Sequence, residues 1–129
     1  MTFFRFSALF AASVGLAAAS SAIARPALVS SAPAMAATAA NVKSVTLTFS
    51  EGLAPAQSGL EIIMTGMPGM EGHHPPMRMG GVKVSVSPDR KSLVATMTRA
   101  LPMGSYDVIW HAAGNDGQRV SGKVIFSAR

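Results

Sequence analysis

Short runs of residues that alternate between apolar and polar side chains constrain the fold of this chain most. Residues 45–49 read Val-Thr-Leu-Thr-Phe, and residues 82–86 repeat the pattern as Val-Lys-Val-Ser-Val. Because successive side chains of a strand point to opposite sides, a period of two is typical of a strand with one buried face. No stretch after the N-terminal segment has a convincing 3.6-residue period. The pattern therefore predicts an antiparallel, all-β protein.

Turn-forming residues separate these runs. We expect strands at 27–30, 45–49, 60–64, 82–86, 92–97, 106–110 and 120–126. The sequence Ser87-Pro88-Asp89-Arg90 contains the turn formers Pro and Asp between two of them. Helix is expected to be at most one turn, near 54–57. About seven short strands separated by turn signals favour a β-sandwich.

The first 24 residues have the features of a secretory signal peptide. Arg5 gives a positive start, residues 8–19 are apolar and small, and Ala22-Ile23-Ala24 matches an A-x-A cleavage site. An uncleaved anchor helix is the alternative, which is disfavoured because the apolar stretch is short and interrupted by Gly and Ser. We therefore expect residues 1–24 to be removed and an exported domain at 25–129, with no membrane span in the mature chain.

The composition excludes several classes of function. The absence of cysteine rules out disulfides, thiolate zinc sites and iron–sulfur clusters. The net charge of +5 comes from scattered Lys and Arg rather than from the basic stripe of a nucleic-acid-binding protein. No Ser-His-Asp arrangement or carboxylate pair is recognisable, so we do not expect an enzyme.

Residues 64–81 form the most unusual segment. Eight of its eighteen residues are Gly or Pro, five are Met and two are His. The Gly and Pro residues disfavour a helix or a central strand, and such a loop lies at the surface, where its backbone finds hydrogen-bond partners. Most methionines in proteins fill gaps in the core, which needs a periodic apolar face that this segment lacks. We therefore expect its thioethers to be accessible.

Accessible thioethers favour one kind of metal ion. A thioether is a soft, neutral donor, and soft donors select Cu(I). In an oxidising compartment cysteine is diverted into disulfides, whereas methionine is not. Zn²⁺, Ca²⁺ and Mg²⁺ need harder donors, and the segment offers little beyond Glu71. The sequence therefore predicts a copper site that prefers Cu(I), with Cu(II) doubtful, and Ag(I) would suit the same sulfur atoms.

The candidate metal ligands are Met64, Met67, Met70, His73, His74 and Met77. For Met64, at the end of an expected strand, ligation and core packing are equally open. Because the two histidines are adjacent, we expect only one of them to reach the metal. Met79 is a weaker candidate. We expect the remaining methionines of the mature chain to be packing residues: Met35, Met97 and Met103.

Several motifs together resemble the CopC/PcoC family of periplasmic copper-resistance proteins, over essentially the whole mature chain. They are Arg25-Pro26-Ala27-Leu28 with Pro33, Leu47-Thr48-Phe49-Ser50-Glu51, Met64-Thr65-Gly66-Met67-Pro68-Gly69-Met70, His74-Pro75-Pro76-Met77, Tyr106-Asp107-Val108-Ile109-Trp110 and Gly122-Lys123-Val124-Ile125-Phe126. The resemblance implies a seven-stranded Greek-key β-sandwich of Ig-like or cupredoxin-like type. It also implies a periplasmic location and a role in copper carriage, homeostasis or resistance.

The resemblance further implies the site residues. Family members hold Cu(I) with loop methionines and one histidine, which correspond to Met64, Met67, Met70, His74 and Met77. The spacing after Met70 is longer here, so that His73 could replace His74.

Many members also bind Cu(II) at the opposite end, through an N-terminal His and a late Asp-x-His. This chain has Arg25 and Asp116-Gly117-Gln118 at those positions. Since a guanidinium has no acceptor and Gln offers only an amide, we expect the Cu(II) site to be lost or severely weakened. His111 lies near Asp116 in the sequence.

Two other functions stay open. The chain could be a β-sandwich interaction module that docks on a protein through its Met-rich segment, since methionine surfaces adapt to partners. It could also be an enzyme with an unrecognised site at His111 and Asp116. The resemblance implies the copper ion as partner, with an inner-membrane CopD-like copper transporter or another periplasmic copper protein as a further one, and no nucleic acid.

Overall fold

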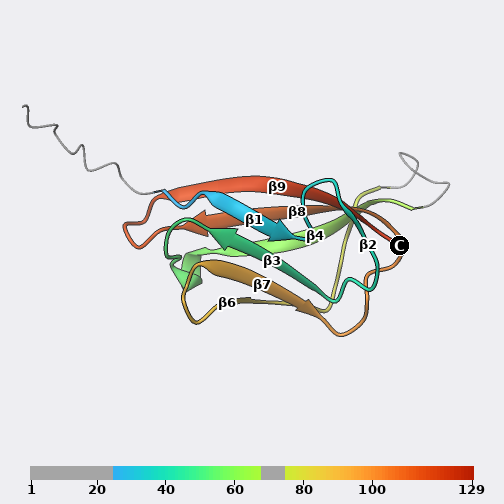
Figure 1. The fold of residues 1–129 in the computed structure, drawn as a ribbon, viewed down its shortest axis with the longest axis horizontal. Helices are drawn as coiled ribbons and strands as arrows, with labels where there is room; N and C mark the ends of the chain where they lie inside the picture. The colour runs from blue at the N-terminus through green and yellow to red at the C-terminus, as the bar shows by residue number, and fades with distance from the viewer. Residues whose placement is uncertain (1–24, 68–74) are drawn as a thin grey trace, which may run out of the picture.

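The structure is a computed structural model that describes residues 25–67 and 75–129. Its elements are β1 (Leu28–Ala32), β2 (Thr38–Ala39), β3 (Ser44–Phe49), the 3₁₀ turn η1 (Pro55–Gln57), β4 (Gly59–Gly66), β5 (Met77–Arg78), β6 (Val82–Val86), β7 (Ser92–Met97), β8 (Gly104–Ala113) and β9 (Arg119–Ala128). Two sheets lie face to face (Figure 1). One has the strand order β1-β3-β7-β6, and the other has the order β2-β9-β8-β4-β5.

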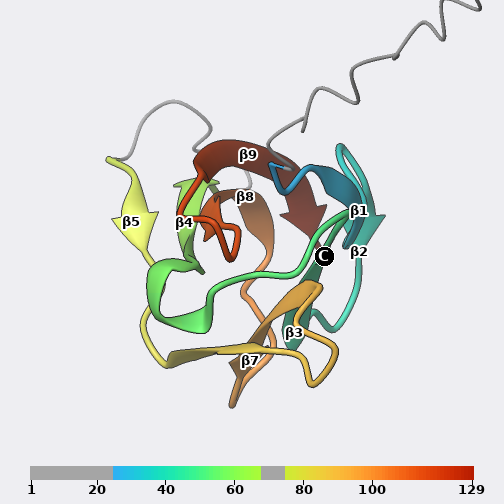
Figure 2. The same cartoon turned by 90° about the vertical axis from the view of Figure 1, so that its left-hand side faces the viewer.

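The predicted all-β sandwich is confirmed. Each of the seven expected strands is present, and β6 and β7 have the expected bounds. The described part of the chain contains two further strands, β2 and β5, so its strand count differs from the prediction. Both are two residues long and lie at the edges of the five-stranded sheet, as Figure 2 shows. Two residues are too few for an alternating pattern to be recognised.

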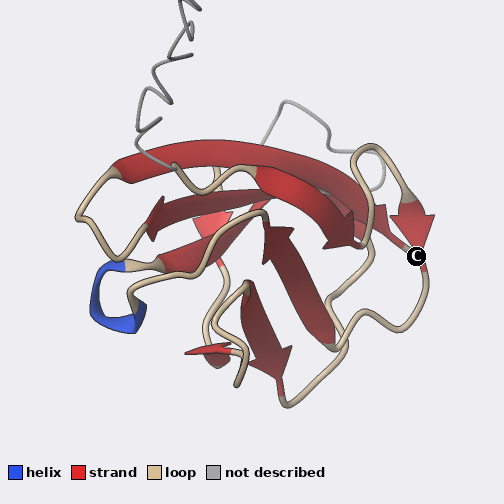
Figure 3. Cartoon of the chain, turned by 60° about the vertical axis from the view of Figure 1, so that its left-hand side comes forward, coloured by secondary structure: helices blue, strands red, loops and turns tan. Residues whose placement is uncertain are grey.

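The chain changes sheet five times in the described residues: on both sides of β2, between β3 and β4, between β5 and β6, and between β7 and β8. Each sheet therefore combines strands from both halves of the sequence, as in a Greek-key sandwich. The hairpin of β6 and β7 turns at Ser87, whose hydroxyl accepts a hydrogen bond from the Ser92 N–H at 3.0 Å. The 3₁₀ turn lies within the region where a single helical turn is expected, and it is blue in Figure 3. No helix in the described ranges is long and apolar enough to cross a membrane.

The core lies between the two sheets and follows the predicted alternation. Every second residue is buried through β3 and through most of β8, including Val45, Leu47, Phe49, Tyr106, Val108 and Trp110. Two aromatic pairs lie in the core. The rings of Phe49 and Trp110, from the two different sheets, meet edge to face at 5.1 Å, and the rings of the cross-strand neighbours Tyr106 and Phe126 stack at 5.5 Å. Burial of these faces is the main source of stability, since apolar area removed from water contributes about 25 cal/mol per Å².

The direction of the strands defines the two ends of the sandwich. β4 and β7 finish at one end, where β8 begins, at the right of Figure 1. The turn between β8 and β9 lies at the opposite end. Met64 of β4 and Met77 of β5 lie at the first of these ends.

Candidate metal centre

At the end of the sandwich where β4 finishes and β8 begins, Met35 lies beyond β9, at the edge of the five-stranded sheet opposite to β5. The other six methionines in the described residues lie at this end on or beside β4, β5, β7 and β8. They are Met64, Met67, Met77, Met79, Met97 and Met103, and we call this the methionine end. They come from three stretches that are distant in sequence and that the sheet topology brings together.

Met64 of β4 and Met77 of β5 are direct cross-strand neighbours. Residues opposite each other in an antiparallel pair lie on the same face, with Cβ atoms about 5 Å apart. Met64 is 4% exposed and also lies opposite Tyr106 of β8, whereas Met77 is 53% exposed on the edge strand. The pair therefore brings two of the predicted ligands together, one in the core and one at the surface.

Met67 and Met77 are accessible, as expected, whereas Met64, for which ligation and core packing were equally open, is buried in the core. The alternation of β4 continues beyond its expected end, so Ile62, Met64 and Gly66 are all buried. Met67 follows the strand and is 37% exposed. The other three predicted ligands, Met70, His73 and His74, lie outside the described residues.

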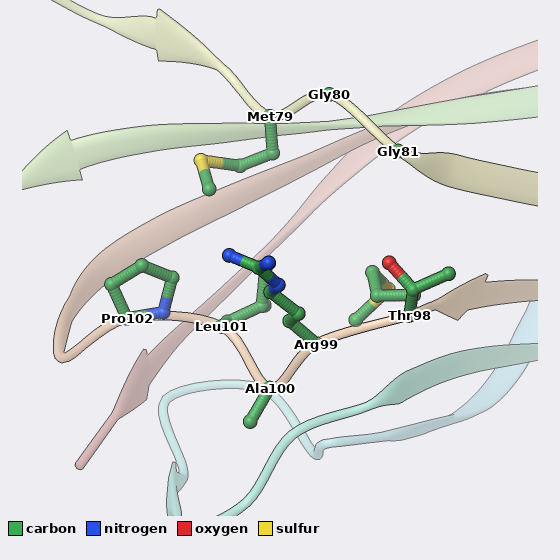
Figure 4. A pocket seen from close by; sticks show the side chains of 9 residues that line it. Met79, Gly80, Gly81, Thr98, Arg99, Ala100, Leu101 and Pro102 are labelled. Carbon is green, nitrogen blue, oxygen red and sulfur yellow. The ribbon is translucent and has the colours of Figure 1, made fainter.

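Met79 and Met97 line a cavity of about 230 Å³ that lies between the link from β5 to β6 and the link from β7 to β8 (Figure 4). The Met79 N–H donates to the Ile62 carbonyl at 2.9 Å, and the Met79 side chain packs partly buried against the core. Arg99 also lines the cavity and extends toward Met79 in Figure 4. Because like charges repel at short range, the guanidinium disfavours a monovalent cation there. We therefore assign no metal site to this cavity.

The packing roles expected for the three remaining methionines are only partly found. Met97 is buried, as predicted. Met35 and Met103 are each 56% exposed, so the prediction is wrong for both, because they lie in links between strands that no opposing sheet covers. The Met35 sulfur accepts a hydrogen bond from the Ile125 N–H at 3.4 Å. For Met103 a local signal was available in its Pro-Met-Gly context directly before a strand.

The link between β7 and β8 is fixed to the core at the methionine end. The buried Tyr106 hydroxyl donates to the Pro102 carbonyl, and the Leu101 N–H donates to the Val42 carbonyl at 2.9 Å. Burial raises the pKa of Tyr106 to about 12, so its phenol is neutral at physiological pH. The Tyr106 phenol therefore adds no negative charge at this end.

The opposite end carries the residues at which the sequence departs from the family pattern. Asp116 lies in the turn between β8 and β9, where its carboxylate accepts a hydrogen bond from the Gln118 N–H at 3.1 Å. His111 lies on the exposed face of β8, with its imidazole beside Gly59. Within the part of the chain that the structure describes, no three His, Asp or Glu side chains form a group suited to a metal ion.

Comparisons of sequence and of structure with known proteins indicate the same family. The sequence model of the CopC domain family matches residues 28–129. Copper resistance protein C of Xanthomonas campestris pv. juglandis is 41% identical over 112 residues, which cover 87% of this chain and 86% of that protein. Copper resistance protein C of Pseudomonas syringae pv. tomato is 40% identical over 126 residues, 96% of this chain and 94% of that protein.

A solved structure shares the fold. It is the crystal structure of PcoC, described as a methionine rich copper resistance protein from Escherichia coli. It superposes with a TM-score of 0.74 at 35% sequence identity, covering 82% of this chain and all of that chain.

Proposed function

The chain belongs to the CopC family, and on this premise we propose that it is a periplasmic, non-enzymatic protein that binds Cu(I) at the methionine end. Its role would be copper carriage, homeostasis or resistance. The proposed ligands are the thioethers of Met64, Met67, Met70 and Met77, with one imidazole from His73 or His74.

The proposal is carried by the convergence of thioethers from separate strands. Met64 and Met77 are cross-strand neighbours, and Met67 is three residues beyond Met64 on the same chain. Sulfur donors leave the charge of the metal uncancelled and need no deprotonation, which favours Cu(I) over Cu(II) and over hard divalent ions.

The exposure of the Met67 and Met77 thioethers also suggests how copper would enter and leave the site. Met67 and Met77 are partly exposed and stand at the two ends of the segment that carries the other candidates, while Met64 lies deeper. An incoming Cu(I) would meet the outer sulfur atoms first. A partner's ligands can replace them one at a time, so that transfer proceeds by ligand exchange without opening the β-sandwich.

Anaerobic titration of residues 25–129 with Cu(I) against a competing chelator tests the proposal. We expect Met67→Leu and Met77→Leu each to weaken Cu(I) binding by at least about tenfold, equivalent to about 1.4 kcal/mol. Leu keeps the approximate volume of Met without its sulfur, so the fold is retained. Met35→Leu is the matched control, because Met35 is at least as exposed as Met67 and Met77 but lies beside β9, far from β5 across the same sheet.

Two results would contradict this function. One is tight uptake of Cu(II) with none of Cu(I). The other is Cu(I) binding that is equally weakened by the Met35→Leu control. Protein docking that persists when copper is chelated, without any Cu(I) uptake, would instead support an interaction module.

We further propose that residues 1–24 are a signal peptide and that Cu(I) passes to a CopD-like membrane transporter or another periplasmic copper protein. The N-terminal residues match the expected n-region, apolar region and cleavage motif. Mass spectrometry of the periplasmic fraction should give a chain that begins at Arg25. A chain retaining Met1 in the membrane fraction would indicate an uncleaved anchor instead.

A further inference from the structure

We propose that Met103, in the link between β7 and β8, supplies an additional thioether that binds Cu(I) together with Met67. The inference rests on the proposed function for the identity of the metal. It adds a ligand that lies 26 residues beyond Met77 along the chain and outside the Met-rich segment.

The position of Met103 follows from a close backbone contact. Gly66 at the end of β4 is paired with Ser105 of β8, and β8 begins at Gly104. A Cβ atom placed on Gly104 would lie only 2.4 Å from the Gly66 carbonyl oxygen, so the two glycines bring the backbones together. Met67 directly follows one glycine and Met103 directly precedes the other. The two methionines therefore flank one contact between neighbouring strands.

Both side chains leave this contact on the solvent side. Gly66 and Gly104 are buried, whereas Met67 and Met103 are exposed by 37% and 56%. A large apolar side chain with this exposure contributes little to packing, and neighbouring exposed apolar side chains commonly mark a binding surface. Two long, flexible thioethers attached on either side of one backbone contact are well suited to share a soft ion.

The backbone of Met103 is held in place while its side chain is free. The Tyr106 hydroxyl binds the Pro102 carbonyl, and the Leu101 N–H binds the Val42 carbonyl at 2.9 Å. A fixed attachment keeps the sulfur within reach of Met67, and the free rotation of the side chain allows it to bind and release a metal. Met103 is also not among the residues that line the cavity beside Arg99.

Oxidative footprinting with Ag(I) tests this assignment residue by residue. Ag(I) is a soft monovalent ion that binds thioethers, and hydrogen peroxide converts a free thioether to the sulfoxide with release of water. We expect Ag(I) to slow sulfoxide formation at Met103 and Met67, as followed by mass spectrometry of peptides. Met35 is the internal control, since its exposed fraction of 56% equals that of Met103 and it lies on the far side of β9. Its oxidation rate should not change.

The outcomes separate the inference from the proposed function. Protection of Met67 and Met77 without protection of Met103 would overturn the role of Met103 and leave the Cu(I) site standing. Protection of none of them would overturn both. Equal protection of Met35 and Met103 would show that silver binds any exposed thioether, which also overturns the assignment. As a second measurement, Met103→Leu should lower Cu(I) affinity several-fold, and Met35→Leu should not.

Discussion

The buried Tyr106 hydroxyl donates a hydrogen bond to the Pro102 carbonyl, in the link that carries Met103. The ionisation of this phenol therefore tests its burial. Tyr106 is the only tyrosine, and burial raises its pKa to about 12. Because this value exceeds the unfolded value of about 10, its contribution to stability is complete below pH 10 and is lost as the pH rises toward 12. We expect phenolate absorbance to titrate near pH 12. Tyr106→Phe should lower the free energy of unfolding at neutral pH by about 1 kcal/mol. Above pH 10, the free energy of unfolding of this variant should fall less steeply than that of the unchanged protein. A midpoint near pH 10 in the folded protein would contradict the burial.

Gly122 makes room for the only tryptophan. A Cβ atom at this position would lie 2.5 Å from Cζ2 of the Trp110 ring, which also contacts Phe49. Gly122→Ala should therefore force the ring or strand β9 to move and should destabilise the protein by about 1–3 kcal/mol. Urea unfolding followed by tryptophan fluorescence measures the change. Gly80→Ala is the control, because a Cβ there meets nothing within 4 Å, and we expect a change within about 0.5 kcal/mol. Equal effects of the two substitutions would contradict the packing argument.

At the level of strands, the sequence was sufficient where one face is buried over several residues. β3, β6, β7 and β8 alternate clearly, and the all-β fold follows from them. The edge strands β2 and β5 were missed because they are held by pairing with a neighbour rather than by a pattern of their own. The end of β4 was also misjudged, since the Gly-rich composition after Met64 concealed that the alternation continues to Gly66.

The candidate site shows the same limit. Composition and family resemblance selected Met67 and Met77, which are exposed at the methionine end. Met103 could not be selected in this way, because its relation to Met67 arises from the pairing of β4 with β8 across a long stretch of sequence. A local pattern contains no information about which distant strand becomes the neighbour.

β5 is held to β4 mainly by its backbone, and this makes a prediction about Arg78. The Met79 N–H binds the Ile62 carbonyl, while the Arg78 guanidinium pairs with the Glu61 carboxylate at 2.9 Å on the exposed face. Exposed ion pairs contribute at most about 1 kcal/mol. We therefore expect Arg78→Ala to lower stability by less than that and to leave Cu(I) affinity unchanged, as measured by urea unfolding and chelator competition. A large loss of affinity would mean that the ion pair positions Met77.

The molecule as a whole has two chemically different ends. Thioethers gather where β4 finishes, whereas Asp116 and Gln118 lie at the turn between β8 and β9, at the opposite end. If the proposed function is right, Cu(I) and Cu(II) should therefore stabilise the folded protein to very different extents. The change in melting temperature on adding each ion compares them directly.

An ion that binds only the folded state raises the free energy of unfolding, by about 2.7 kcal/mol when its free concentration is 100 times its Kd. We expect Ag(I), or Cu(I) without oxygen, to raise the melting temperature of residues 25–129, and Cu(II) to leave it nearly unchanged. The double variant Met67→Leu with Met77→Leu should lose the Ag(I) effect, since only sulfur atoms are removed. His111→Ala should retain it, because His111 lies on the outer face of β8. Stabilisation by Cu(II) that equals that by Ag(I) and disappears in His111→Ala would place the metal at the wrong end for this proposal.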